Sequence, residues 1–178
     1  MFRHDPSHTG YTESSGPNTN LTQWSFETDG EVESSPAVVG GRVFVGSEDG
    51  NIYCLDAATG AYIWSFETDD QVESSPAVVG GRVFVGSEDD KVYCLNASSG
   101  VLVWSYRTGG NVRSSPALVG GRVFVGSYDG KVYCLNATTG AYVWSYGTGR
   151  RIFSSPAVVG GRVFVGSYDG KVYCLNAS

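Results

Sequence analysis

The amino-acid sequence repeats itself every 40 residues. The 23-residue stretch from Ser114 to Asn136 returns at residues 154–176 with 22 identical positions, and earlier copies begin at Ser34 and Ser74. One tryptophan and one cysteine recur at the same step: Trp24, Trp64, Trp104 and Trp144, and Cys54, Cys94, Cys134 and Cys174. A fixed period of this length is typical of propellers, solenoids and other repeat arrays.

Each period contains four short apolar segments separated by turn residues. In the first copy these segments are residues 36–39, 42–46, 51–55 and 61–66. Gly40-Gly41 predicts a two-residue hairpin, because a type I′ turn needs positive φ at both central positions. Apolar residues stand at consecutive positions, which indicates strands buried on both faces. We therefore expect an all-β protein, a β-propeller of four-stranded antiparallel blades with four blades per chain.

The repeat also predicts how the chain is divided. Residues 24–33 match the last strand of a blade, and residues 154–178 match the first three strands. We expect the propeller to comprise residues 24–178, with 24–33 completing the last blade so that no sheet edge stays unpaired. Residues 1–23 form a leader outside the repeat.

The stretch Cys54 to Trp64, CLDAATGAYIW, resembles the tryptophan-docking motif of pyrroloquinoline quinone (PQQ) repeats, alanine-x-aspartate-x-x-threonine-glycine-x-x-x-tryptophan. Cysteine replaces the leading alanine, and Asn96 and Asn136 replace the aspartate in later copies. Residues 2–25 resemble the segment that opens such propellers. The chain is thus similar over nearly its whole length to the quinoprotein-like propellers. That family includes dehydrogenases and also non-enzymatic propellers such as an assembly-factor lipoprotein of bacterial outer membranes.

The resemblance implies two alternative functions. In PQQ alcohol dehydrogenases the cofactor lies beneath a vicinal cysteine pair, beside Ca²⁺ held by acidic and amide side chains. This chain has no Cys-Cys pair and no non-repeat insertion. We therefore expect a non-catalytic scaffold or interaction module, engineered or recently amplified. The alternative is a fragment or relative of a PQQ-dependent alcohol or sugar dehydrogenase. No catalytic, cofactor-binding or metal-binding residue is predicted.

The cysteines and histidines fit this interpretation. The cysteines occur once per repeat, never as the close pair of a zinc knuckle, and equivalent positions on successive blades lie too far apart for a disulfide. We expect buried structural thiols, and tryptophans that dock one blade on another. His4, Asp5 and His8 could bind a metal, but histidines in a Pro/Ser/Gly-rich segment are more often turn formers.

Differences between the four copies gather in two loops, those joining consecutive blades and those joining the second and third strands of a blade. In an up-and-down blade both loops emerge on the same face. Variation on one face of a rigid scaffold indicates a binding surface, although drift of solvated loops explains it nearly as well. The candidate residues are Glu27, Glu31, Glu33, Glu67, Gln71, Glu73, Arg107, Asn111, Arg113, Tyr128, Arg151, Phe153 and Tyr168.

Charge divides the chain into two halves. Residues 24–103 carry 14 acidic and 3 basic groups, whereas residues 104–178 carry 2 acidic and 8 basic groups. The acidic half argues against nucleic-acid binding, which needs a continuous basic surface. The sequence permits four blades that close on themselves or that supply half of an eight-bladed ring. The resemblance to the quinoprotein-like propellers implies the shallow blade angle of an eight-bladed ring, so we expect a homodimer that closes such a ring. The basic residues Arg107, Arg113, Arg150 and Arg151 would then lie beside the acidic residues Glu27, Asp29, Glu31 and Glu33 of the other chain.

The sequence also allows predictions about membrane spans and cellular location. It contains no apolar run of 18 residues, so no membrane span is predicted. Relatives in the family act in the periplasm or outside the cell, but MFRHDPSHTG lacks the apolar core of a signal peptide. The loop face could bind a protein or a small molecule, whose identity the sequence does not reveal.

Overall fold

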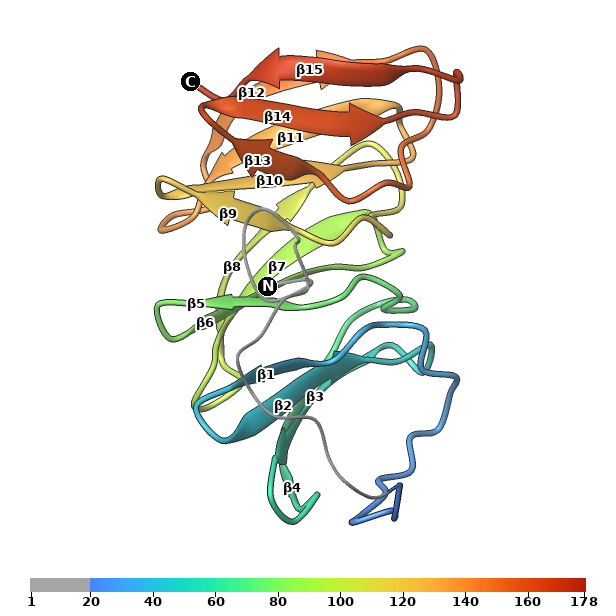
Figure 1. Cartoon of the computed structure of the whole chain (residues 1–178), viewed down its shortest axis with the longest axis vertical. Coiled ribbons are helices and arrows are strands. Elements are labelled where there is room, and N and C mark those ends of the chain that lie inside the picture. The colour runs from blue at the N-terminus through green and yellow to red at the C-terminus, as the bar shows by residue number, and fades with distance from the viewer. Residues whose placement is uncertain (1–19) are drawn as a thin grey trace.

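The computed structural model describes residues 20–178, which form 15 β-strands (Figure 1). The strands are Ala37–Val39 (β1), Arg42–Gly46 (β2), Asn51–Asp56 (β3), Tyr62–Glu67 (β4), Ala77–Val79 (β5), Arg82–Gly86 (β6), Lys91–Asn96 (β7), Leu102–Arg107 (β8), Ala117–Val119 (β9), Arg122–Gly126 (β10), Lys131–Asn136 (β11), Tyr142–Gly147 (β12), Ala157–Val159 (β13), Arg162–Gly166 (β14) and Val172–Asn176 (β15). His4, Asp5 and His8 lie outside the described residues. No helix within residues 20–178 is long and apolar enough to cross a lipid bilayer.

The strands form four antiparallel sheets, each a blade. Blade 1 has the order β1-β2-β3-β4, and blades 2 and 3 repeat it with β5–β8 and β9–β12. Blade 4 differs from the prediction, because it contains only β13-β14-β15 and residues 24–33 form no strand. Blade 4 and the start of the described chain lie at opposite ends of the longest axis, so the predicted pairing is not made within one chain (Figure 1).

The hairpins agree with the sequence. Gly40 and Gly41 have φ of 59° and 73°, which confirms that both central positions are left-handed. The turn sets the register Ala37↔Phe44 between β1 and β2. In β3 and β4 the register shifts between Cys54 and Leu55, and blades 2 and 3 repeat the shift. The strands begin or end within about one residue of the predicted bounds.

The apolar core lies between blades as well as within them. The second strand of each of the first three blades supplies one phenylalanine, Phe44, Phe84 and Phe124, each no more than 2% exposed. Phe44 lies 5.9 Å from Trp64, measured between ring centroids, and the same distance recurs for Phe84 with Trp104. Val78 of blade 2 belongs to the same core cluster as Ala37 and Phe44 of blade 1. Each blade is therefore stabilised by its neighbours as well as by contacts among its own strands.

Tryptophan docking connects the blades on their outer side. The indole Nε1 of Trp64 donates to the carbonyl of Ala97 at 3.2 Å, and Trp104 repeats this bond with Ala137 at 3.1 Å. Trp24 makes the same bond to Ala57 at 3.1 Å. Trp24 therefore docks on blade 1 in the same way as Trp64 docks on blade 2.

One prediction about the cysteines is wrong. Cys54, Cys94 and Cys134 are buried, but Cys174 is exposed. The first three lie on third strands covered by a fourth strand and by the next blade. Cys174 lies on β15, which has neither neighbour in the chain. Burial of this position is therefore decided by what covers the strand.

The second blade offers a stability test at Asp90. This residue has φ of 71° where the other blades have glycine, and a side chain in the left-handed region costs about 1 kcal/mol. Its carboxylate also forms an ion pair with Arg107 Nη1 at 3.1 Å. Arg107 is exposed and Asp90 is partly exposed, so the pair contributes only about 0.3–0.5 kcal/mol. Asp90→Gly should therefore raise the free energy of unfolding by roughly 0.5 kcal/mol, measured by urea denaturation.

Asp90→Ala is the matched control, because it removes the ion pair but keeps a Cβ in the left-handed region. It should not stabilise the protein. Equal stabilisation by alanine and glycine would show that relief of charge, rather than of backbone strain, is responsible.

Candidate binding surface

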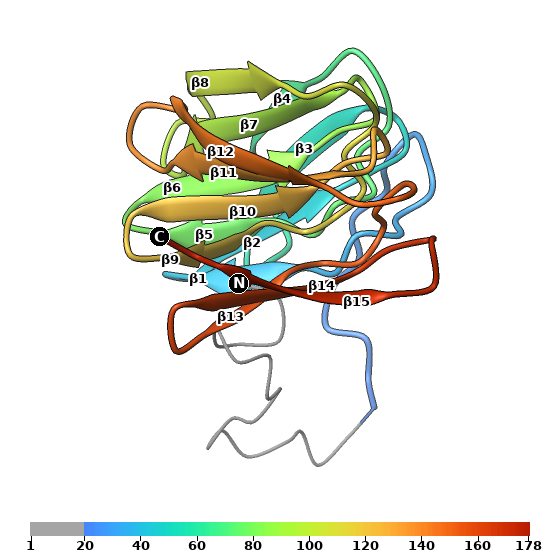
Figure 2. The same ribbon diagram turned by 90° about the horizontal axis from the view of Figure 1, so that it is seen from above.

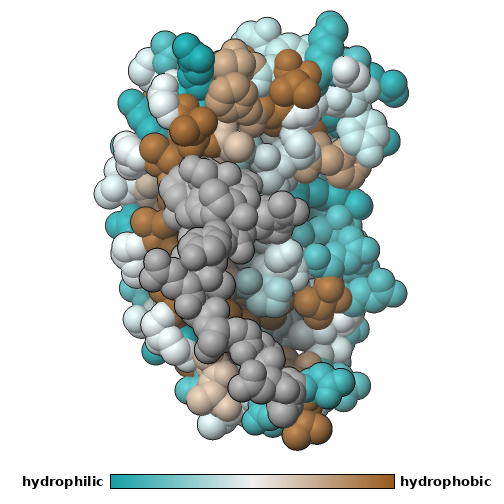
Figure 3. Space-filling model, viewed as in Figure 1, coloured by the Kyte–Doolittle hydropathy of each residue, from teal (hydrophilic) through white to brown (hydrophobic). Residues whose placement is uncertain are grey.

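The variable loops lie together on one side of the blades, here called the loop face (right-hand side of Figures 1 and 2). The Glu48 amide donates to the Glu31 carbonyl at 2.9 Å, and the Val72 amide donates to the Ser47 carbonyl at 3.0 Å. In blades 1 to 3, each loop within a blade is thus bonded to the inter-blade loops before and after it. Hydrophilic residues predominate on this side of the space-filling view (Figure 3).

An aspartate in every blade makes the loop face rigid. Asp169 accepts hydrogen bonds from the Tyr173 hydroxyl at 2.5 Å and from the Lys171 amide at 3.1 Å. The Tyr173 bond, aided by backbone amides, lowers the pKa of Asp169 to about 2. Asp49, Asp89 and Asp129 make the same pair of bonds in their own blades. The turns therefore hold the variable side chains on a fixed frame.

An acidic cluster around one arginine joins blades 2 and 3 on this face. Arg113 forms ion pairs with Glu73 at 2.8 Å and with Glu88 at 2.5 Å, and Asn111 Nδ2 donates to Glu88 at 2.7 Å. The Glu73 and Glu88 side chains are only 13% and 10% exposed. Burial and a hydrogen bond with Glu88 raise the pKa of Glu73 to about 7, although Arg113 opposes the shift.

This shift predicts a pH dependence of stability. The folded state keeps the Glu73 proton up to about pH 7, whereas the unfolded chain loses it near the ordinary value of 4.5. The free energy of unfolding should therefore fall as pH rises from about 4.5 to 7 and then level off. Glu73→Gln, which stays uncharged, should flatten that slope in urea unfolding at a series of pH values.

Glu67→Gln on the exposed end of β4 is the control for this measurement and should keep the wild-type slope. An unchanged slope in Glu73→Gln would contradict the assignment to Glu73.

An aromatic cluster with two arginines occupies the loop face of blades 3 and 4. The Phe153 ring lies 4.3 Å from Tyr128 and 4.7 Å from Tyr168, measured between centroids. The Arg151 guanidinium lies 4.6 Å from the Tyr168 ring and 5.2 Å from Phe153, within cation–π range. Arg113 lies 5.5 Å from Tyr128 and so connects this cluster to the acidic one. The combination offers flat apolar surface beside positive charge.

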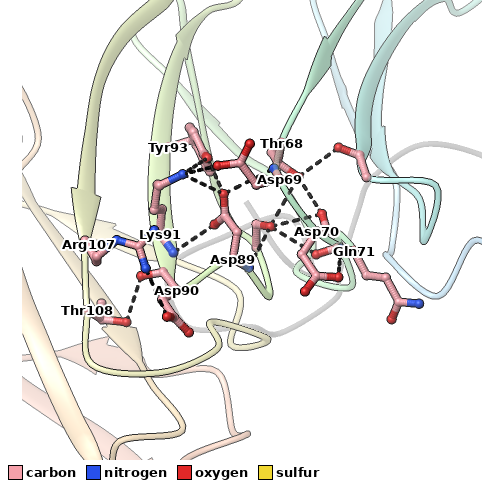
Figure 4. Close-up of polar contacts among 12 residues, drawn as sticks. Thr68, Asp69, Asp70, Gln71, Asp89, Asp90, Lys91, Tyr93, Arg107 and Thr108 are labelled. Atoms are coloured by element: carbon pink, nitrogen blue, oxygen red, sulfur yellow. Dashed lines mark hydrogen bonds and ion pairs between the residues drawn. The ribbon is translucent and has the colours of Figure 1, made fainter.

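A lysine joins the blades nearer the outer edge (Figure 4). Lys91 Nζ contacts Asp69 at 2.7 Å and Asp89 at 3.1 Å, and it lies 3.2 Å from the Tyr93 hydroxyl. The Asp69 bond, together with the other two, raises the pKa of Lys91. The ammonium group therefore stays charged over the physiological pH range.

Three carboxylates gather at the other end of the loop face. Glu31, Glu33 and Glu48 can place one oxygen each within 4.8 Å of the others. Burial, followed by the charges of Glu31 and Glu33, raises the pKa of Glu48. Within residues 20–178 no ion pair is formed with these three carboxylates, so they make an acidic surface beside blade 1.

The predicted site residues separate into two groups. Glu27, Glu67 and Arg107 are exposed along the outer edge, where Glu67 and Arg107 end β4 and β8. The inner loops contain the other ten: Glu31, Glu33, Gln71, Glu73, Asn111, Arg113, Tyr128, Arg151, Phe153 and Tyr168. Sequence reasoning missed Glu48, Glu88, Lys91 and Asp69. Glu48 and Glu88 occupy the positions of Tyr128 and Tyr168, so comparing all four copies would have included them.

Comparison with known families identifies the fold. The model of one family, described as the β-propeller of the beta-alanine-activating enzyme, matches residues 6–178. The chain belongs to this β-propeller family. The match supports a PQQ-like propeller but does not single out the PQQ-repeat family. No curated protein sequence matches the chain at a significant level.

Solved structures agree with the propeller assignment. BamB from Moraxella catarrhalis has 27% identity and a TM-score of 0.77, and the match covers 87% of this chain and 49% of BamB. The computationally designed protein Ika4 has 19% identity and a TM-score of 0.81, and the match covers 90% of this chain and 100% of Ika4. The quinohemoprotein alcohol dehydrogenase ADHIIG from Pseudomonas putida HK5 has 21% identity and a TM-score of 0.73. The match covers 85% of this chain and 33% of ADHIIG. The propeller described here thus spans about half the length of BamB.

Proposed function

We propose that the chain is a non-catalytic interaction module whose loop face binds a charged partner. One observation carries this proposal: blades of nearly identical sequence differ mainly where they meet solvent on the loop face. The residue just before Ser-Ser-Pro in successive inter-blade loops changes from Glu33 and Glu73 to Arg113 and Phe153. The strands beneath hold these residues in equivalent positions. Fixed spacing with changing chemistry is how a rigid scaffold presents a binding surface.

The surface has two chemically different parts. The acidic part is centred on Glu31, Glu33 and Glu48, and the basic, aromatic part on Arg151 and Phe153. Aromatic and arginine side chains are enriched where protein partners bind. We infer that the basic part takes an acidic peptide segment and that the acidic part takes a basic one.

Peptide titration tests this proposal. A short glutamate-rich peptide should shift backbone NMR signals around Arg113, Arg151 and Tyr168, and a lysine-rich peptide should shift those around Glu31 and Glu33. Both effects should weaken as salt is raised, because exposed charges are screened. A neutral Gly/Ser peptide is the control. Shifts confined to the opposite face, or no shifts at millimolar peptide, would refute the proposal.

The alternative is a relative of PQQ-dependent dehydrogenases, supported by the likeness of the fold to ADHIIG. Its test is dye-linked oxidation of alcohols by the protein supplied with PQQ and Ca²⁺. We expect no turnover above a protein-free control. Turnover that requires both additions would favour the enzyme.

The near-identity of the repeats suggests how the module arose. Likeness to the designed protein Ika4 is compatible with design, and recent amplification of one blade would give the same pattern.

A further inference from the structure

The same interface between an inter-blade loop and the preceding blade is formed three times along the chain. One half of this interface is left open at each end of the array of blades. The inter-blade loops insert Val72, Val112 and Ile152, all fully buried, against Gly46, Gly86 and Gly126 of the preceding blades. The amides of these three residues donate to the carbonyls of Ser47, Ser87 and Ser127 at 3.0–3.1 Å. At the next glycine, Gly166, a Cβ would meet only Ser154 among the described residues, at 3.6 Å. The valine that begins the series, Val32, is 49% exposed.

Blade 4 has a pocket at the place where such a valine would insert. Phe153, Gly166 and Tyr168 line it, together with Lys171 and Val172. The equivalent space in blade 2 is filled by Val112. The pocket is thus the unfilled member of a repeated packing arrangement.

The outer edge of blade 4 is open as well. Val172 on β15 is 80% exposed, whereas its counterparts Val92 and Val132 are fully buried. In blades 1 to 3 a fourth strand covers this edge. Because backbone groups at an exposed sheet edge can pair with another strand, β15 is open to strand addition.

Residues 24–33, here called the N-terminal segment, already lie where a fourth strand belongs. The Phe26 ring lies 5.4 Å from Tyr53 of blade 1, and the equivalent pair Phe66 and Tyr93 is 5.5 Å apart. Trp24 docks on Ala57 as described above. The segment thus packs on blade 1 as the fourth strand of a preceding blade would, but it pairs with no strand in the part of the chain that the structure describes.

We propose that the N-terminal segment of one chain adds to β15 of a second chain, and that the reciprocal pairing closes two chains into one ring. The complete blades give the register, because β3 and β4 pair Cys54 with Trp64 and Ile52 with Phe66. The same register would pair Cys174 with Trp24, Val172 with Phe26, and Lys171 with Glu27 of the other chain. Val32 of that chain would enter the pocket beside Gly166.

Two observations favour a second copy over closure within one chain. The N-terminal segment and β15 lie at opposite ends of the long axis (Figure 1), so closure within the chain would change every interface between blades. The two ends also carry opposite charge, with Glu27, Glu31 and Glu33 on one and Arg150, Arg151 and Lys171 on the other. Opposite charges speed and orient association. The pocket shares Phe153 and Tyr168 with the loop face, but the pairing is inferred from the unfilled packing position and the open edge of β15 and does not rest on the loop-face function.

Size-exclusion chromatography with light scattering tests the pairing on the full chain. The wild type should show about twice the chain mass of 18.9 kDa. Val32→Asp should give a monomer, since it would place a charge in the pocket, and Gly166→Ala should do so because its Cβ would occupy the space for Val32. Val159→Asp is the matched control: this valine is 57% exposed and its counterparts in the other blades are also exposed, so the dimer should persist.

A thiol assay gives a second readout. Cys174 should react with a maleimide in the Val32→Asp monomer and be protected in the wild-type dimer, as Trp24 of the other chain would cover it. A wild-type monomer at the highest soluble concentration would overturn the proposal. So would an open polymer, or a dimer that survives both Val32→Asp and Gly166→Ala with Cys174 still reactive.

Discussion

Trp104→Ala should lower the free energy of unfolding by about 3–5 kcal/mol, the usual cost of removing a large buried aromatic side chain. The indole is 8% exposed, packs against Phe84 at 5.9 Å between centroids, and donates to the Ala137 carbonyl at 3.1 Å. It also lies against Gly140, where a Cβ would come within 2.7 Å of the ring. Its loss opens a cavity between blades 2 and 3 and removes one donor from the part-buried Ala137 carbonyl, which also accepts from Arg82 Nη1 at 3.1 Å.

Urea unfolding followed by far-UV circular dichroism measures the effect, and the Tm should fall by about 6–20 °C for a chain of this length. Trp24→Ala, measured on dilute monomer, is the matched control. Trp24 makes the same hydrogen bond but is only partly buried, so its loss should cost less than half as much. A cost below about 1 kcal/mol for Trp104→Ala, well under the usual range, would show that the indole does not hold the two blades together.

Gly86→Ala should destabilise the protein by about 2–3 kcal/mol, because the added methyl group overpacks the interface between blades 2 and 3. The new Cβ would collide with the carbonyl oxygen and the side chain of Val112. Val112 cannot move aside easily: it is fully buried, and its amide donates to the Ser87 carbonyl at 3.0 Å. The strain therefore falls on backbone atoms.

Gly147→Ala is the matched control for this substitution. Gly147 ends β12 as Gly86 ends β6, but a Cβ there meets nothing within 4 Å. We expect Gly147→Ala to be neutral or slightly stabilising, since alanine reduces the freedom of the unfolded chain. If both variants lost the same stability in urea unfolding, the effect would belong to the strand end and not to Val112.

Local signals were sufficient to predict most of the fold. The period of 40 determined the number of blades, and Gly40-Gly41 determined a left-handed hairpin because only glycine adopts that φ without strain. Apolar runs such as Arg42–Gly46 identified strands buried on both faces. Copy-to-copy comparison likewise placed Arg113 and Phe153 among the candidate site residues. These features depend on residues close in sequence or on one repeated pattern.

Tertiary structure alone decided which side chains meet and which surfaces stay open. No sequence signal paired Arg113 with Glu73 and Glu88, since each partner belongs to a different loop and their contact depends on the angle between blades. Cys174 has the same sequence surroundings as buried Cys134 but is exposed, because burial depends on a neighbouring strand that the chain does not place there. The sequence by itself therefore determined the blade, through its turns and apolar pattern. Only the packing of blade on blade decided the contacts of the loop face and the open edge of β15, because those depend on long-range geometry.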